Sequence, residues 1–227
     1  MASPLRFLHG AETNVTKDGP VFFQPVNSSV IGLVMTAPTH LLAPDLQSPN
    51  VLNLIWSDQR AARLYGVHRP GFTGPSAFKA IYQKTGAQVL GVNVFDPAVH
   101  KQDVATAEHT FAGGLITLAH QDITAITVQD QAQAVTHVEG VDYTLDRATG
   151  VISRVTTGAI AASAVVSIAY SYADLTLITS ADIIGGVDIN GVRSGLELLK
   201  EGLITYGRKA KLIMAPGFAS TTAVRNA

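Results

Sequence analysis

Glycines and basic residues near the end of the chain have a spacing that could bind phosphate. The run Gly202-Leu203-Ile204-Thr205-Tyr206-Gly207 has the glycine spacing of the loop that cradles nucleotide phosphates. That loop needs lysine and then a hydroxyl side chain after the second glycine, but Arg208 and Lys209 follow here. The run also closes an expected helix, whereas a phosphate site opens one. We therefore predict a helix C-terminus here, and no nucleotide or other cofactor.

A serine between two glycines could be the nucleophile of a hydrolase. In Gly191-Val192-Arg193-Ser194-Gly195 the glycines do not stand two residues to either side of the serine, as a nucleophile elbow requires. Glu197 follows Ser194 by three residues, which is the spacing of a capping box. We therefore predict that Ser194 caps a helix. Asp142 and Asp146 flank a predicted hairpin strand instead of forming a calcium loop, so we expect them to be solvated turn carboxylates.

The histidines do not form a metal-binding motif. None has a second histidine three or four residues away, and Glu108-His109 lacks the second histidine of a metalloprotease helix. The seven are His9, His40, His68, His100, His109, His120 and His137. A metal site formed by histidines that are distant in sequence stays open. No pattern indicates a catalytic, cofactor-binding or metal-binding residue, so we predict that the protein is not an enzyme.

The composition argues against several other classes of function. The formal net charge is -1 without any block of like charges, so the basic surface of a nucleic-acid-binding protein is missing. Cysteine is absent, and the longest apolar stretch, 159–170, is shorter than the roughly 20 residues that span a bilayer. We expect neither nucleic-acid binding nor membrane insertion. Charged residues make up only 15% of the chain, which suits a subunit buried among its own copies or an ordinary protein rich in small residues.

Signals for strands and helices alternate in the two outer segments of the chain. Compact apolar runs bounded by turn-forming residues predict four strands, at 30–35, 51–56, 88–95 and 211–214. Ser57 and Ser76 can cap helices that run to about Tyr65 and Lys84, and the helix that begins at Ser194 ends near Gly207. This alternation predicts an α/β core layer with a partly parallel sheet, built from the separate segments 26–96 and 177–227.

The middle of the chain, residues 97–176, carries strand and turn signals without a helix signal. Short strands are predicted at 115–118, 125–128, 134–139, 143–145, 151–155 and 165–172. The turn 146–150 ends in a glycine that can take a positive φ, so the two strands beside it should form a hairpin. We predict an inserted all-β sandwich or barrel, which makes the whole protein a mixed α+β fold.

The two ends of the chain indicate further features. Residues 1–25 contain several prolines and glycines between small apolar clusters, which predicts an extended N-terminal arm. Thr221 or Thr222 could cap a helix, but only five residues follow Thr222, too few for a stable helix alone. We therefore expect the chain to stop inside an element of a longer protein.

Short motifs occur in a fixed order over most of the chain. Near the start are Phe7-Leu8-His9-Gly10 with Glu12, and Ser28-Ser29-Val30-Ile31-Gly32-Leu33-Val34 followed by Thr36-Ala37-Pro38. The middle has Gly140-Val141-Asp142-Tyr143, Thr149-Gly150-Val151-Ile152 and Tyr170-Ser171-Tyr172. The last part has Asp182-Ile183-Ile184-Gly185-Gly186-Val187-Asp188, Gly195-Leu196-Glu197-Leu198-Leu199 and Leu212-Ile213-Met214-Ala215-Pro216-Gly217-Phe218. Read in this order, the motifs resemble the tail sheath proteins of contractile phages and related injection machines.

This resemblance implies a structural role. Subunits of that family stack helically around a tail tube and contract to drive the tube through a target envelope. The implied partners are further copies of the chain, the tail tube protein, and the baseplate and tail terminator proteins. The implied location is the virion tail, after assembly in the cytoplasm of the bacterial host. Members of the family usually continue into a C-terminal domain and arm, which residues up to Ala227 do not include.

The N-terminal arm supplies the residues expected to join subunits. Two apolar segments of the arm could add a strand to the sheet of a neighbouring copy. Their residues are Arg6, Phe7, Leu8, His9, Gly10, Val21, Phe22, Phe23 and Gln24. The alternative is that the same residues pair within their own subunit. Two other functions also stay open: a binding module that recognises a host surface or glycan through Tyr143, Tyr170 and Tyr172, and an α/β hydrolase or transferase.

Overall fold

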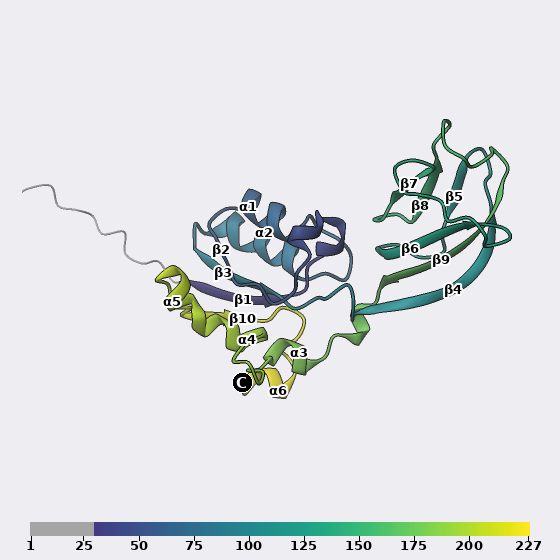
Figure 1. Ribbon diagram of the computed structural model, residues 1–227. Coiled ribbons are helices and arrows are strands. Elements are labelled where there is room, and N and C mark those ends of the chain that lie inside the picture. The colour runs from purple at the N-terminus through teal and green to yellow at the C-terminus, as the bar shows by residue number, and fades with distance from the viewer. Residues whose placement is uncertain (1–29) are drawn as a thin grey trace, which may run out of the picture.

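Residues 30–227 are described by a computed structural model, in which they form a mixed α and β fold (Figure 1). Three sheets and a set of short helices make up this part of the chain. The mixed α+β class expected from the sequence is confirmed. The predicted N-terminal arm, residues 1–25, lies outside the described residues.

The four-stranded sheet brings together strands that are far apart in the sequence. In spatial order its strands are β10 (Leu212–Met214), β1 (Ile31–Met35), β3 (Val89–Asn93) and β2 (Asn53–Ile55). Strand β1 runs parallel to both β3 and β10, whereas β2 runs antiparallel to β3. Each strand lies within a run predicted from its apolar residues, and the partly parallel pairing is confirmed.

Helices cover both faces of this sheet (Figure 1). One face carries α1 (Asp58–Tyr65) and α2 (Gly74–Lys84), and the other carries α3 (Ser180–Ile184), α4 (Gly195–Leu198), α5 (Gly202–Tyr206) and α6 (Thr222–Arg225). Four 3-10 turns lie between these elements, at Thr39–Leu41, Pro44–Leu46, Leu175–Leu177 and Leu199–Glu201.

Side chains alternate along β1 between the two apolar cores beside the sheet. Leu33 and Met35 are buried in the core next to α1 and α2, and Val34 is buried in the core on the opposite face. Gly32 also points to the opposite face, where an added Cβ would lie 2.7 Å from a methyl group of Leu199. A glycine at this position therefore allows the turn that contains Leu199 to approach the strand closely.

The helix starts agree only partly with the sequence signals. The Ser57 hydroxyl accepts a hydrogen bond of 3.2 Å from the backbone N–H of Arg60, so the predicted cap of α1 is confirmed. The predicted cap at Ser76 is wrong, because α2 begins at Gly74 with Pro75 in its first turn. Proline is favoured there because the N–H groups of the first turn have no acceptor within the helix, so the missing N–H of proline costs no hydrogen bond. Ser76 lies inside the helix, where its hydroxyl contacts His68 Nδ1 at 3.0 Å.

The predicted capping box at Ser194 is also wrong. Ser194 precedes α4, but its hydroxyl accepts from the backbone N–H of Gly186 at 3.1 Å and not from the helix. Gly195 takes a positive φ of 56°, so the chain turns away from the Ser194 side chain at the first residue of the helix. The predicted end is confirmed, because α5 stops at Tyr206 with Gly207 in the left-handed conformation.

Two three-stranded sheets surround a separate core in the middle of the chain. One sheet has the order β4 (Lys101–Thr110), β9 (Val165–Ala173) and β6 (Ile123–Asp130). The other has the order β5 (Leu115–Thr117), β8 (Val151–Arg154) and β7 (Tyr143–Asp146). The predicted hairpin is confirmed, because β7 and β8 pair antiparallel and Gly150 takes a φ of 74°. We call residues 101–173 the β part.

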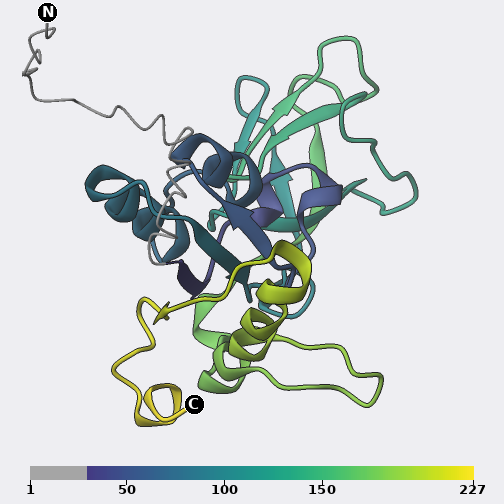
Figure 2. The same ribbon diagram turned by 90° about the vertical axis from the view of Figure 1, so that its left-hand side faces the viewer.

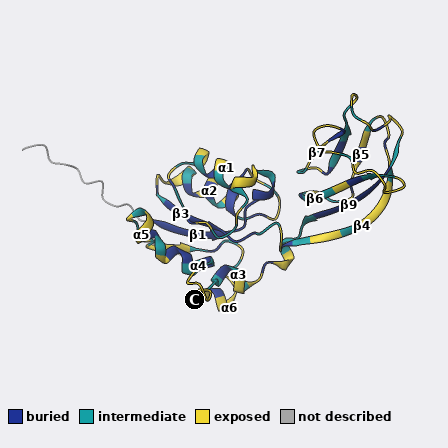
Figure 3. Ribbon diagram, viewed as in Figure 1, coloured by how far each residue is buried: buried dark blue, intermediate teal, exposed yellow. Residues whose placement is uncertain are grey.

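Two features of the β part differ from the prediction. Strand β4 was not predicted because most of its side chains are exposed (Figure 3), and it forms by pairing along β9. The predicted strand at 134–139 is wrong. Asp130 Oδ1 accepts hydrogen bonds from the backbone N–H groups of Ala134 and Val135, at 2.6 and 3.0 Å, and the segment then pairs with β6 only through an isolated bridge between Gln129 and Thr136.

The chain enters and leaves the β part at one place. Lys101 at the start of β4 pairs with Ala173 at the end of β9, and the backbone N–H of Asp174 donates to the carbonyl of His100 at 3.0 Å. The paired strands β4 and β9 run from the four-stranded sheet into the β part (Figure 1). The division of the chain into domains at residues 97 and 176 stays a prediction.

A polar junction also joins the β part to the loop between α1 and α2. Arg69, in the loop between α1 and α2, donates through Nε to Asp122 Oδ1 at 2.9 Å, and its terminal nitrogen contacts the carbonyl of Ala148. The buried His40 side chain lies with its Nε2 3.6 Å from the same carboxylate oxygen. Burial raises the pKa of Asp122, but the contacts with His40 and Arg69 outweigh it and hold this pKa below its ordinary value.

We predict that Gly150 is essential for the stability of the β part and that Gly140 is not. Both take a positive φ, at which an alanine costs about 1 to 2 kcal/mol. At Gly150 a Cβ would also overlap the carbonyl oxygen of His120, whereas at Gly140 it would meet no atom within 4 Å. Urea unfolding should show a loss of about 3 kcal/mol or more for Gly150→Ala and about 1 kcal/mol for Gly140→Ala. Equal losses would contradict the close packing of the hairpin turn against His120.

We predict that Asp122→Asn lowers the free energy of unfolding by about 1 to 3 kcal/mol at pH 7, because it removes the charge that pairs with the partly buried Arg69. The pKa of Asp122 is lower in the folded state than in the unfolded chain. Its carboxylate therefore stabilises the fold at pH values above the ordinary aspartate pKa of about 4. That contribution is lost as the pH falls through the folded-state pKa. The difference between the two proteins should therefore shrink in acid.

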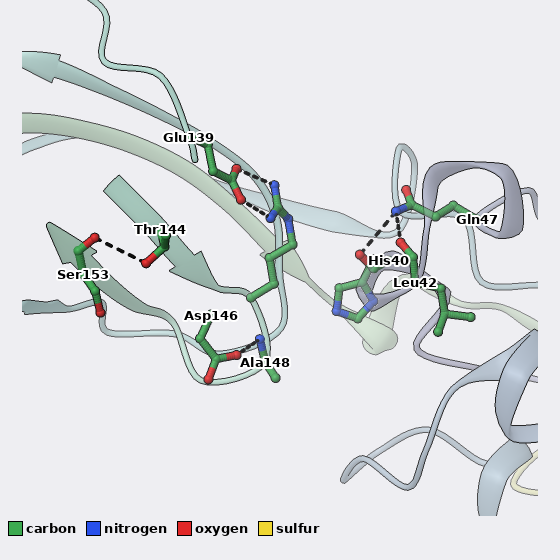
Figure 4. A network of polar contacts seen from close by, with 9 residues as sticks. His40, Leu42, Gln47, Glu139, Thr144, Asp146, Ala148 and Ser153 are labelled. Carbon is green, nitrogen blue, oxygen red and sulfur yellow. Dashed lines mark hydrogen bonds and ion pairs between the residues drawn. The ribbon is translucent and has the colours of Figure 1, made fainter. Parts of the chain in front are cut away.

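The exposed pair Arg147–Glu139 supplies a matched control for this measurement (Figure 4). Glu139→Gln should change the free energy of unfolding by less than about 1 kcal/mol, because exposed ion pairs contribute little. If Asp122→Asn costs no more than Glu139→Gln, the junction does not hold the β part in place.

Candidate functional site

The residues predicted to join subunits cannot be placed in this fold. The nine residues all lie in the segment before residue 30, outside the described residues. Their role in assembly stays a prediction. The candidate site is therefore sought on the surfaces, cavities and polar clusters of residues 30–227.

Among residues 30–227 no group of three or more His, Asp or Glu side chains is placed to hold a metal ion. Several histidines make contacts that support the fold. His100 Nδ1 accepts from the backbone N–H of Asp96 at 2.9 Å, where the chain enters β4. His120 stacks on Tyr172 with ring centroids 4.0 Å apart, and its Nδ1 lies 2.8 Å from the Tyr170 hydroxyl. The rings of His100 and His120 therefore stabilise the fold.

The carboxyl ends of β1 and β3 are where an α/β protein commonly binds a ligand. A small cavity of 230 Å³ lies there, next to Asn93. The Asn93 amide is buried, and its oxygen accepts from the backbone N–H groups of Ala37 and Phe95 at 2.9 and 3.1 Å. Its nitrogen donates to the Thr39 hydroxyl and the Phe95 carbonyl at 3.2 and 3.1 Å. The amide thus fixes the turns that follow both strands.

The two hairpin carboxylates also stabilise turns. Asp146 Oδ1 accepts from the backbone N–H of Ala148 at 3.0 Å, in the turn before β8 (Figure 4). Asp142 is buried, which corrects its expected place in solvent, and it accepts from the backbone N–H groups of Val138 and Ala159, both at 2.8 Å. These two hydrogen bonds hold the pKa of Asp142 below its usual value.

A second set of contacts in the same view orders the loop after β1. Gln47 reaches back across this loop (Figure 4), and its Nε2 donates to the carbonyls of Leu42 and His40 at 2.8 and 3.4 Å. These bonds brace the segment that carries His40 into the junction with Asp122. The labelled polar groups therefore act within the fold.

The tyrosines considered for glycan binding do not form an open aromatic surface. Tyr143 and Tyr170 are buried in the core of the β part, and Tyr172 packs against that core with its ring on His120. A glycan platform needs exposed ring faces. The structure therefore gives no support to a glycan site on these three residues.

An apolar groove lies near the end of the chain. It has a volume of 780 Å³ and lies between β10 and the helices α4, α5 and α6. Its lining residues are Leu196, Leu199, Lys200, Leu203, Lys209, Ala210, Ile213, Ala215, Ala219, Val224, Arg225 and Ala227. Ile213 and Leu203 are both exposed. The sequence signal for this surface is weak, because apolar strands and helices of this kind are usually buried.

A second apolar surface lies in the loop between α3 and α4. Val187, Ile189 and Val192 are all exposed there, and Ile189 is fully exposed at 102%. The loop projects away from the helices (Figure 2). The sequence pattern marked this stretch only as part of a family motif and carried no signal of its exposure. The groove and this loop are the surfaces that could bind a partner.

No helix in the described part of the chain is long and apolar enough to cross a membrane. Comparison with known proteins gives two matches. A family model described as "Protein of unknown function UCP028589" matches residues 79–181. The tail sheath protein of Burkholderia phage BcepMu is 38% identical over 221 residues, which cover 96% of this chain and 45% of that protein.

The match to the phage protein includes nearly the whole chain, so the order of the short motifs along the sequence is part of a continuous similarity. This chain spans less than half of the length of that relative. The resemblance inferred from the motifs is confirmed at the level of the family, and the chain belongs to the phage tail sheath proteins.

Proposed function

We propose that this chain is a structural subunit of a contractile phage tail sheath, which polymerises helically around a tail tube and contracts to drive the tube through the target envelope. The observation that carries the proposal is the 38% identity with a phage tail sheath protein over nearly the whole chain. The subunit acts through contacts that rearrange between copies and does not act as an enzyme.

The surfaces of the described residues support a role in assembly. At the carboxyl ends of the parallel strands, polar side chains form hydrogen bonds within the protein. Apolar side chains, in contrast, are exposed in the groove and in the loop between α3 and α4. Exposed apolar patches commonly mark contacts between proteins. Head-to-tail contacts that do not close into a ring generate helical filaments, as a sheath requires.

We also propose how the chain is organised for this role. Residues 26–96 and 177–227 form the core layer, residues 97–176 form an outward-facing β domain, and residues 1–25 form the arm. The arm donates a strand to a neighbouring subunit, so that main-chain hydrogen bonds persist while the rigid cores rotate. The alternative is that the arm pairs within its own subunit.

The partners follow from this proposal. They are further copies of the chain, the tail tube protein, and the baseplate and tail terminator proteins, in the virion tail after assembly in the host cytoplasm. Nucleic acid is not a partner, in keeping with the net charge of -1 and the lack of a basic block, and the chain does not insert directly into a membrane.

We predict that removing residues 1–25 from the sheath protein that carries this sequence abolishes tube formation and leaves the melting temperature nearly unchanged. Strand addition draws its affinity from main-chain hydrogen bonds and a few apolar anchors, so its loss should affect assembly more than folding. Tube yield by electron microscopy and melting temperature by calorimetry should be measured on the same preparations. A large fall in melting temperature would show that the arm belongs to its own subunit.

A single substitution refines this experiment. Phe22→Ser should reduce the tube yield if the side chain is an anchor between subunits, at a cost of about 1 to 3 kcal/mol for each contact. Val67→Ser, at an exposed apolar position of the described core, is the matched control and should leave the yield unchanged. Normal tubes from both the deletion and Phe22→Ser would show that the arm is not the link.

A further inference from the structure

The loop between α3 and α4 presents apolar side chains on a rigid support. We call residues 187–192 the apolar loop. Its Asp188 carboxylate accepts from the backbone N–H groups of Asn190 and Val192 at 2.8 and 2.7 Å. The backbone N–H of Asp188 donates to the carbonyl of Val192 at 2.9 Å, and Gly191 closes the turn with a φ of 82°. A loop ordered in this way loses little entropy on binding.

The exposure of this loop is costly without a partner. Ile189 stands at the tip with its whole side chain in solvent, and Val187 and Val192 flank it. Burial of one such aliphatic side chain stabilises a contact substantially, because the free-energy gain grows with the apolar area removed from water. The turn thus holds three apolar side chains where a second molecule can reach them.

The apolar groove has the shape and chemistry to receive this loop. Its floor is made of aliphatic side chains, among them Leu199, Val224 and the exposed Ile213 and Leu203. A volume of 780 Å³ is large enough for a few aliphatic side chains. The groove therefore fits a short apolar loop, of which Ile189 would be the central anchor.

The charges around the two surfaces are complementary. Lys200, Lys209 and Arg225 belong to the lining of the groove, and all three are exposed. Lys200 contacts Glu197, so Lys209 and Arg225 supply most of the positive charge. The apolar loop contains Asp188 and no basic residue. Opposite charges at the rim of a contact favour this pairing over others.

The loop and the groove cannot meet within one molecule. The loop extends to one side of the helices α4 and α5, whereas β10 and α6 lie on the opposite side of these helices (Figure 2). The loop of one copy can therefore reach only the groove of another copy. Because the two surfaces differ, the contact is head-to-tail and can be repeated from copy to copy.

We propose that the apolar loop of one subunit inserts into the apolar groove of the next, with Ile189 as the anchor and Lys209 and Arg225 at the rim. The choice of a second copy as the partner rests on the proposed function, since a sheath consists of repeated subunits. The contact itself is defined by residues separate from the N-terminal arm.

Cysteine cross-linking tests this contact directly, because the chain has no cysteine of its own. Ile189→Cys and Ile213→Cys are made in separate proteins, which are mixed and oxidised. The expected product is a disulfide-linked pair that contains one of each variant. The matched control replaces Ile213→Cys with Val67→Cys, an aliphatic position outside the groove that is somewhat more exposed than Ile213, and should give little product. Equal yields from both mixtures would overturn the proposal.

A substitution series separates the two surfaces. Ile189→Ser changes the loop, and Ile213→Ser changes the groove. Each substitution should weaken self-association by roughly tenfold or more in sedimentation experiments, because each removes one aliphatic side chain that the contact would bury. A mixture of Ile189→Ser and Ile213→Ser should form pairs, because each contributes one intact surface, but should not form longer chains. Lys209→Glu should lower the cross-linking rate, and added salt should reduce the rate for the unchanged protein. Longer chains from the mixture would overturn the head-to-tail assignment.

Other occupants of the groove give different products. If the N-terminal arm fills the groove, Ile213→Cys will cross-link to Phe22→Cys in higher yield than to Ile189→Cys, and the proposal is wrong. A failure of this loop contact, together with loss of tubes on deletion of the arm, would leave the sheath function standing. If the cross-link does not form, and tubes still form normally after deletion of the arm, neither proposed contact is needed for assembly.

Discussion

The antiparallel pairing of β4 with β9 is the constraint on which this fold depends. It brings Lys101 next to Ala173, so the chain leaves the four-stranded sheet and returns to it at one place. Only then can β10 pair with β1, although some 180 residues separate them in the sequence. Closing so long a loop costs conformational entropy, which the pairing of β4 along β9 offsets, although a register shift between Val104 and Ala107 interrupts the ladder. The core that contains Ile183, Leu198 and Val224 depends on this return.

The β part is connected through this ladder and through one polar junction. Arg69 pairs with Asp122 and also contacts Ala148, so a single side chain links the loop before α2 to two turns of the β part. Asp122 itself takes a φ of 55°, a conformation that aspartate tolerates better than most residues. A few polar contacts of this kind can be exchanged more easily than a large apolar interface.

Several polar groups are buried in this fold, whereas several apolar side chains are exposed. The Asn93 amide is buried and bonds to backbone groups and the Thr39 hydroxyl, and the buried Asp142 carboxylate accepts from two backbone N–H groups, so both order turns. Ile189, Leu203 and Ile213 instead remain in contact with solvent. Exposed apolar side chains of this kind commonly mark a contact with another molecule.

Sequence alone determined the strands of the four-stranded sheet, the hairpin at Gly150 and the family, because apolar periodicity, turn glycines and motif order are local properties. It did not predict β4, whose exposed and charged residues show no alternation and which forms only beside β9. It misplaced the start of α2, which begins at Gly74 with Pro75 in its first turn. It placed the start of α4 directly after Ser194 but not the partner of the Ser194 hydroxyl, which accepts from Gly186 instead of from the helix. The groove, the exposed loop and the Arg69–Asp122 junction were decided by the tertiary structure, since each joins residues that are distant in the chain and carry no local signal.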